Sequence, residues 1–158
     1  MGAMDSLPLF HSWPLYDAAE RLGMRAMSVP GSPILESVRA LASHRVGVWS
    51  CDLADNRLSW TAAVHRLFGL PEDEPVTRDF AASRYLPRSR VAMETLRAYA
   101  IEHRRGFTMD AMILRADGDR RWMRLSAVPI LSGGRVVRLT GTKQDVTAHY
   151  DGPDWQDV

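Results

Sequence analysis

The sequence predicts an α+β fold: a five-stranded antiparallel sheet with helices packed on one face, preceded by an N-terminal helical extension. Between residues 107 and 147, three runs of alternating apolar and polar residues are separated by Asp117-Gly118 and Gly133-Gly134. Such dipeptides supply the positive φ angles that short hairpin turns require. Two further β-rich runs and several helical segments precede these three strands, and this order groups the helices on one face of a sheet.

The first 45 residues form an extension outside the expected sheet. Apolar residues at helical spacing predict one amphipathic helix over 15–27 and a second over 33–44, separated by Pro30 and Gly31. We expect these helices to bury their apolar stripes either on the sheet or against a second copy of the chain. The residues expected at a dimer contact are Leu15, Leu22, Ile34, Val38 and Leu41.

The expected main domain covers residues 46–149 and begins with two strands, over 46–53 and 57–60. Thr61 follows as the cap of a short helix, which ends at Gly69 because glycine readily adopts a left-handed conformation.

A longer helix is expected over 88–105 and is expected to end at Gly106. A short helical turn over 77–86 precedes it, and residues 150–158 form an acidic C-terminal tail. The apolar stripe expected along the long helix comprises Ala92, Leu96, Tyr99 and His103.

Four segments, in this order and at this spacing, resemble the PAS domain family, specifically the bacterial sensory type with a PAC motif. They are GVWSCDL at 47–53, LSWTAAVHRLFGL at 58–70, RADGDRRW at 115–122 and GTKQDVT at 141–147. The sequence departs from the family pattern at 85–89, where Tyr-Leu-Pro-Arg-Ser replaces His-Pro-Asp-Asp, and at Met112, where the family usually has an arginine.

The resemblance implies a non-catalytic sensory or signalling module that binds a small apolar ligand or a protein partner and relays a conformational shift. The two amphipathic helices over 15–27 and 33–44 lead us to expect that it does so as a homodimer. The resemblance also implies that Asp145 and Thr147 link the sheet to the output of the module. Two alternatives stay open: a ligand-free protein-interaction scaffold, and a small cone-shaped enzyme, which would need a buried acid beside the cavity. The expected ligand cavity comprises Leu96, Tyr99, Met112, Met93, Trp122 and Trp60.

Composition limits the function classes. The chain has 158 residues, with 20 basic against 19 acidic side chains and a formal net charge of +1. A nucleic-acid-binding protein usually shows a clustered basic excess, so we expect no nucleic-acid partner. No apolar run approaches the length of a membrane span, so we expect no membrane association. One cysteine, Cys51, excludes an internal disulfide, and we expect a cytoplasmic protein.

No side-chain pattern identifies a cofactor. His103 and His65 are candidates for haem ligation, but His103 also suits a helix C-terminus, where a cation complements the dipole. His65 is expected at the surface of a short helix. Cys51 lies on a strand rather than in the helical motif of flavin–cysteine photoreceptors, and is expected to be a buried apolar residue. We therefore expect neither haem nor flavin, no metal site and no catalytic residues, and the cofactor stays unknown.

Overall fold

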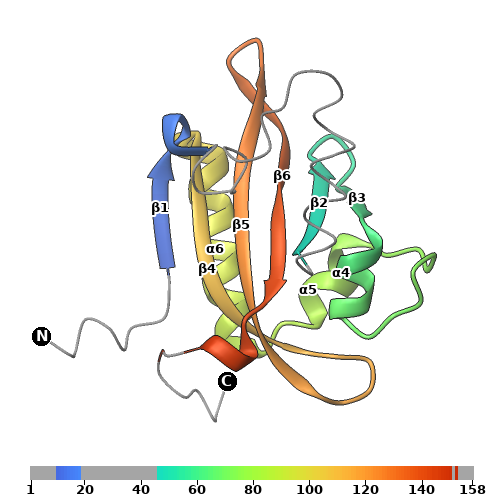
Figure 1. Ribbon diagram of the computed structural model, residues 1–158. Helices are drawn as coiled ribbons and strands as arrows, with labels where there is room; N and C mark the ends of the chain where they lie inside the picture. The colour runs from blue at the N-terminus through green and yellow to red at the C-terminus, as the bar shows by residue number, and fades with distance from the viewer. Residues whose placement is uncertain (1–9, 19–45, 151, 153–158) are drawn as a thin grey trace, which may run out of the picture.

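The structure is a computed structural model that describes residues 10–18, 46–150 and 152. It contains one antiparallel sheet with strand order β1-β4-β5-β6-β2-β3. Three helices cover one face: α6 runs behind β4 and β5, and α4 and α5 lie beside β2 and β6 (Figure 1). The elements are β1 (Phe10–Pro14), η1 (Leu15–Asp17), β2 (Val46–Asp52), β3 (Arg57–Trp60), α4 (Ala62–Leu67), α5 (Arg78–Ser83), α6 (Pro87–His103), β4 (Arg105–Leu114), β5 (Arg120–Ser132), β6 (Arg135–Asp145) and η3 (Thr147–His149).

The α+β fold class is confirmed, with its antiparallel sheet and one-sided helices. The two expected hairpins join β4 to β5 and β5 to β6. Their turns use the predicted glycines: φ is +87° at Gly118, +57° at Gly133 and +78° at Gly134. The helices expected over 15–27 and 33–44 lie outside the described residues, except for η1 at the start of the first.

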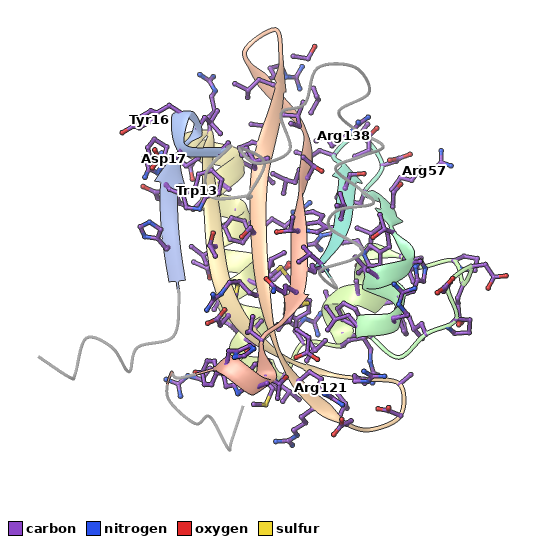
Figure 2. The ribbon with its side chains drawn as sticks, in the orientation of Figure 1. Trp13, Tyr16, Asp17, Arg57, Arg121 and Arg138 are labelled. Atoms are coloured by element: carbon purple, nitrogen blue, oxygen red, sulfur yellow. The ribbon has the colours of Figure 1, made fainter. Side chains whose placement is uncertain are left out.

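The sheet has six strands rather than five, because β1 adds an edge strand beside β4. Trp13 anchors this strand: its side chain is 1% exposed, and its Nε1 donates a hydrogen bond to Thr108 Oγ1 at 3.0 Å. Its ring lies over Gly106, where a Cβ atom would come within 2.2 Å of the ring carbons. Figure 2 shows Trp13 at the β1 edge of the sheet. The strand was missed because it is only five residues long, ends in Pro14 and pairs with a distant segment.

Two details of the long helix were also wrong. Helix α6 ends at His103 with Arg104 in the left-handed region, at φ 55°, so Gly106 is a strand residue rather than the cap. The buried face of the helix consists of Ser89, Met93 and Ala100, with Leu96 packed beside them. Small residues face the sheet because they allow a close approach: Ser89 Oγ accepts a hydrogen bond from the Met112 amide at 2.9 Å.

Helix α4 packs directly on β2. A Cβ atom at Gly47 would lie 2.2 Å from Val64 Cγ2, so only glycine allows this contact. Thr61 occupies the N-cap position, but its hydroxyl accepts a hydrogen bond from the Val48 amide at 3.0 Å instead of capping the helix. The threonine therefore ties the start of α4 to the sheet.

The hydrophobic core lies between the helices and the inner face of the sheet. Alternate residues of each central strand point into it, as Phe107, Met109, Ala111 and Ile113 do from β4. On the outer face, Met112, Trp122 and Val146 form a separate small cluster. Within the described residues, no helix is long and apolar enough to cross a membrane.

Candidate functional site

A cavity of about 50 Å³ lies between the inner face of the sheet and helices α5 and α6. Most of its wall is apolar, but it also contains three basic side chains. It is lined by Trp49, Cys51, Leu58, Arg78, Ala81, Ala82, Tyr85, Met93, Arg97, Phe107, Leu125, Leu139 and Lys143.

Lys143 is the most unusual residue of this cavity. It is the chain's one lysine, the other 19 of the 20 basic residues being arginine. The alternation of β6 places it on the inner face with Leu139 and Gly141, and its side chain is 5% exposed. Burial lowers the pKa of Lys143 from 10.5 to about 7, and the electrostatic interaction with Cys51 acts in the opposite direction.

Four aromatic rings surround the ammonium group of Lys143. Its Nζ lies 5.1 Å from the ring centre of Phe68, 5.2 Å from Trp60, 5.6 Å from Trp49 and 5.7 Å from Tyr85. These rings favour the charged form through cation–π attraction, but they supply no hydrogen-bond acceptor. Among the described residues, no carboxylate or carbonyl pairs with Nζ.

Further hydrogen-bond donors near Lys143 also lack acceptors. The indole Nε1 atoms of Trp49 and Trp60 are buried and have no partner among the described residues. Tyr85 is 5% exposed, and burial raises the pKa of its phenol. Buried donors are normally paired in folded proteins, so several unpaired ones beside one cavity need an explanation.

Two arginines complete the polar part of the wall. Arg78 of α5 pairs with Glu94 of α6, with 2.5 Å between Nη2 and Oε1, and this hydrogen bond raises the pKa of Arg78. Arg97 of α6 donates a hydrogen bond to Asn56 Oδ1 at 3.3 Å. The cavity wall therefore connects α5, α6 and the turn between β2 and β3.

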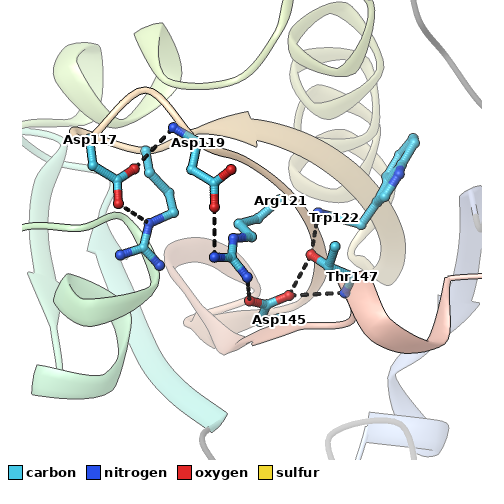
Figure 3. Close-up of polar contacts among 7 residues, drawn as sticks. Asp117, Asp119, Arg121, Trp122, Asp145 and Thr147 are labelled. Carbon is cyan, nitrogen blue, oxygen red and sulfur yellow. Dashed lines mark hydrogen bonds and ion pairs between the residues drawn. The ribbon is translucent and has the colours of Figure 1, made fainter.

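A second polar cluster closes the C-terminal end of the sheet. Asp145 Oδ1 accepts hydrogen bonds from the Thr147 amide at 2.9 Å and the Thr147 hydroxyl at 2.6 Å. The same hydroxyl accepts a hydrogen bond from the Trp122 amide at 2.9 Å. Arg121 bridges Asp119, at 2.6 Å, and Asp145, at 3.6 Å. Figure 3 shows this chain of contacts, which we call the terminal network.

The expected cavity residues are only partly brought together. Met93 lines the cavity, and Leu96 and Trp60 pack against the core around it. Tyr99 is 44% exposed, and its ring contacts that of His103 instead, with 4.2 Å between ring centres. Met112 and Trp122 lie in the cluster on the outer face, because their positions in β4 and β5 alternate with the inward-facing ones.

Sequence reasoning missed Lys143, Arg78, Arg97 and Trp49 as cavity residues. One signal was present: Leu139, Gly141 and Lys143 share one strand face, so a lysine stands where the pattern requires an inward-facing residue. No comparable signal marks the arginines, because they reach the cavity from helices, and tertiary packing determines which side of a helix points toward the sheet.

The cofactor candidates occupy different environments. His65 is 6% exposed, so its expected surface position is wrong: its Nδ1 lies 3.1 Å from the Thr61 carbonyl oxygen and its Nε2 lies 2.9 Å from that of Glu74. His103 is half-exposed at the end of α6. Cys51 is buried, as expected, and lines the cavity. The described residues contain no group of three or more histidine, cysteine or acidic side chains placed to hold a metal ion.

Of the residues expected at a dimer contact, only Leu15 is described. It lies in η1 and packs against the outer-face pair Trp13 and Val128. Leu22, Ile34, Val38 and Leu41 lie outside the described residues.

The comparisons with known proteins converge on one fold. The family model of the PAS fold matches residues 57–143. The PAS domain of a protein from Colwellia psychrerythraea superposes with a TM-score of 0.61 and 18% identity, over 75% of this chain and 100% of that chain. A sensory box histidine kinase/response regulator from Burkholderia thailandensis gives a TM-score of 0.60 and 19% identity, over 70% and 83%.

An RNA-binding light-oxygen-voltage receptor gives a TM-score of 0.60 and 15% identity, over 70% of this chain but 32% of that chain. No curated protein matches the sequence. At identities of 15–19%, the similarity to these solved structures establishes a shared fold and no more. The family model matches residues 57–143, which is more than half of the chain.

Proposed function

Since the chain belongs to the PAS family, whose members act as sensors in signalling proteins, we propose that it is a non-catalytic sensory module that responds to a small molecule in its cavity. The ligand would favour one arrangement of α5 and α6 against the sheet. A ligand shifts such an equilibrium only by its difference in affinity for the two arrangements, so it must contact parts that move relative to one another. The composition of the cavity wall supports this proposal, because a ligand there would contact both helices and the strands.

One observation carries this proposal: strand β6 belongs to both sites. Lys143 lines the cavity, and Asp145, two positions further along the same strand, holds the terminal network. Arg138 lies near the start of β6, and Arg121 lies at the opposite end of the sheet (Figure 2). A change in the cavity that shifts the end of β6 would therefore reach Thr147 and η3.

The output would pass through the two ends of the chain. Thr147 begins η3, and Tyr150 stacks on Trp122 with 3.8 Å between ring centres. We propose that the module acts as a homodimer, with the N-terminal segment packed on the sheet or across the dimer, and that it engages a signalling protein in the cytoplasm. Analytical ultracentrifugation tests the dimer: a monomer at high micromolar concentration, unchanged by deletion of residues 1–32, would contradict it.

The volume of the cavity favours one alternative, a ligand-free interaction scaffold. Drug-sized ligands occupy pockets of about 300–1,000 Å³, whereas this cavity measures about 50 Å³. The ligand of a sensor must therefore be very small, or the helices must move to admit it. The cone-shaped enzyme would need a buried acid beside the cavity, and the lining residues that the structure describes include no Asp or Glu.

Native mass spectrometry separates the sensor from the scaffold. A sensor purified with its ligand has a native mass above its denatured mass. Ala82 lines the cavity and is 3% exposed, so Ala82→Leu should fill the cavity and remove the excess mass. Ala98→Leu makes the same change on the exposed side of α6 and should retain the ligand. A native mass equal to the denatured mass, with no ligand recovered from a fragment screen, would support the scaffold.

A further inference from the structure

The cavity combines an apolar wall with an excess of positive charge. The described part of its lining contains Lys143, Arg78 and Arg97 but no acidic side chain. One carboxylate, Glu94, pairs with Arg78 from outside this lining. Lys143 is nine-tenths buried and lines the cavity, and no described residue supplies a counter-ion to it.

The unpaired hydrogen-bonding groups in and beside the cavity are donors. The Nε1 atoms of Trp49, which lines the cavity, and of Trp60, whose ring centre lies 5.2 Å from Lys143 Nζ, are buried donors without a partner among the described residues. Lys143 Nζ adds a charged donor that faces aromatic rings. A buried donor without an acceptor is costly, and a ligand that brings acceptor oxygens removes this cost. A cationic ligand would instead meet like charge and further donors.

We propose that the cavity binds a small monocarboxylate, with its oxygens toward Lys143 and its short apolar tail against Met93, Leu125 and Leu139. This inference rests on the proposed sensory function and specifies the ligand class. The volume of about 50 Å³ limits the ligand to on the order of four to six non-hydrogen atoms, the size of acetate to butyrate. The aromatic ring of Phe107 and the thiol of Cys51 complete a largely apolar wall around the tail.

Carboxylate binding is coupled to a proton. Burial holds the pKa of Lys143 at about 7 without ligand, and an adjacent carboxylate raises it, so binding above pH 7 requires proton uptake. The affinity should then fall by about tenfold per pH unit above pH 7, or about 25-fold between pH 6.5 and 8.5. The charged or titratable groups that line this cavity or pack on its aromatic rings are Cys51 of β2, His65 of α4, Arg78 of α5, Tyr85 after α5 and Arg97 of α6.

The experiment compares carboxylates with their uncharged amides. Acetate, propionate and butyrate are titrated against acetamide, propionamide and butyramide at constant ionic strength, with chloride as the control anion. Nitrogen–proton correlation NMR spectra show the indole N–H signals of Trp49 and Trp60. Labelling lysine with ¹³C at the ε position gives a single side-chain signal, because the chain has one lysine. We expect the carboxylates to bind at least tenfold more tightly, to shift both indole signals and to raise the midpoint of the lysine titration.

The variant Lys143→Met keeps the length of the side chain but removes its charge, and should bind carboxylates and amides equally. Arg138→Met, on the exposed part of β6, should bind as the wild type does. Amides that bind as tightly as carboxylates to the wild type would overturn the inference and leave the sensory function standing. If neither the carboxylates nor the amides bind but the protein carries a different small molecule, the carboxylate inference is likewise overturned and the sensory function stands. If no molecule of any class binds, both proposals fail.

Discussion

Replacing Lys143 by methionine should stabilise the protein at neutral pH, although it removes a residue from the core. In the folded chain the pKa of Lys143 is about 7, against 10.5 for an ordinary lysine. At 1.36 kcal/mol per pKa unit, burial of the charged form costs about 5 kcal/mol below pH 7. We therefore expect Lys143→Met to raise the free energy of unfolding by up to about 5 kcal/mol at pH 6.

The difference in proton binding between the folded and unfolded states determines how the stability of the wild type changes with pH. The unfolded chain keeps the lysine proton up to about pH 10.5, whereas the folded chain releases it near pH 7. Because the unfolded state binds more protons in this window, the wild type becomes more stable as the pH rises from 7 to about 10, and the variant loses this rise. Below pH 7 both states are protonated and the full cost remains.

Urea unfolding at pH 6, 8 and 9.5, followed by far-UV circular dichroism, measures this difference. Arg138→Met is the matched control, since Arg138 lies on the same strand but is exposed. The gap between Lys143→Met and the wild type should narrow with pH, and the control should follow the wild type. A Lys143→Met protein that is less stable than the wild type at pH 6, with an unchanged pH dependence, would refute the reasoning.

Three further substitutions test the contacts that hold the fold and the terminal network. Gly47→Ala should lower the free energy of unfolding by about 1–3 kcal/mol in urea titrations, because the new methyl would overlap Val64; an unchanged midpoint would show that α4 does not pack this closely. Thr147→Val should cost about 1–3 kcal/mol and speed hydrogen exchange at the Trp122 amide, whose acceptor is lost; unchanged exchange there would contradict the terminal network. Trp13→Ala should cost about 3–5 kcal/mol and release β1, seen as faster exchange in that strand, whereas retained protection would show that Trp13 is not its anchor.

The backbone plan of the domain could be predicted because its signals are local. The turns at 117–118 and 133–134 and the alternation of the strands that they join depend on neighbouring residues only. Strand β1 could not be predicted, because its pairing depends on Trp13 filling the space over Gly106, far away in the sequence.

The candidate site was harder to predict, because it depends on which way each helix faces. The expected stripe of α6 included Tyr99, but the structure buries Ser89 and Ala100, whose small side chains let the helix approach β4. Hydrophobicity alone gave no weight to these small residues. Lys143 was overlooked for a related reason: a lysine is normally exposed, and its burial follows only from the facing of β6 in the assembled sheet.

Hydrogen exchange at residues 146–149 tests most directly whether the cavity communicates with the C-terminal end of the sheet. Filling the cavity by Ala82→Leu should change the exchange rates of the Val146 and His149 amides, which bond to Trp122 and Val146 and do not line the cavity. Ala98→Leu, on the exposed side of α6, should leave these rates unchanged. Rates at 146–149 that stay the same in Ala82→Leu, with changes confined to the cavity wall, would contradict a sensory relay through β6.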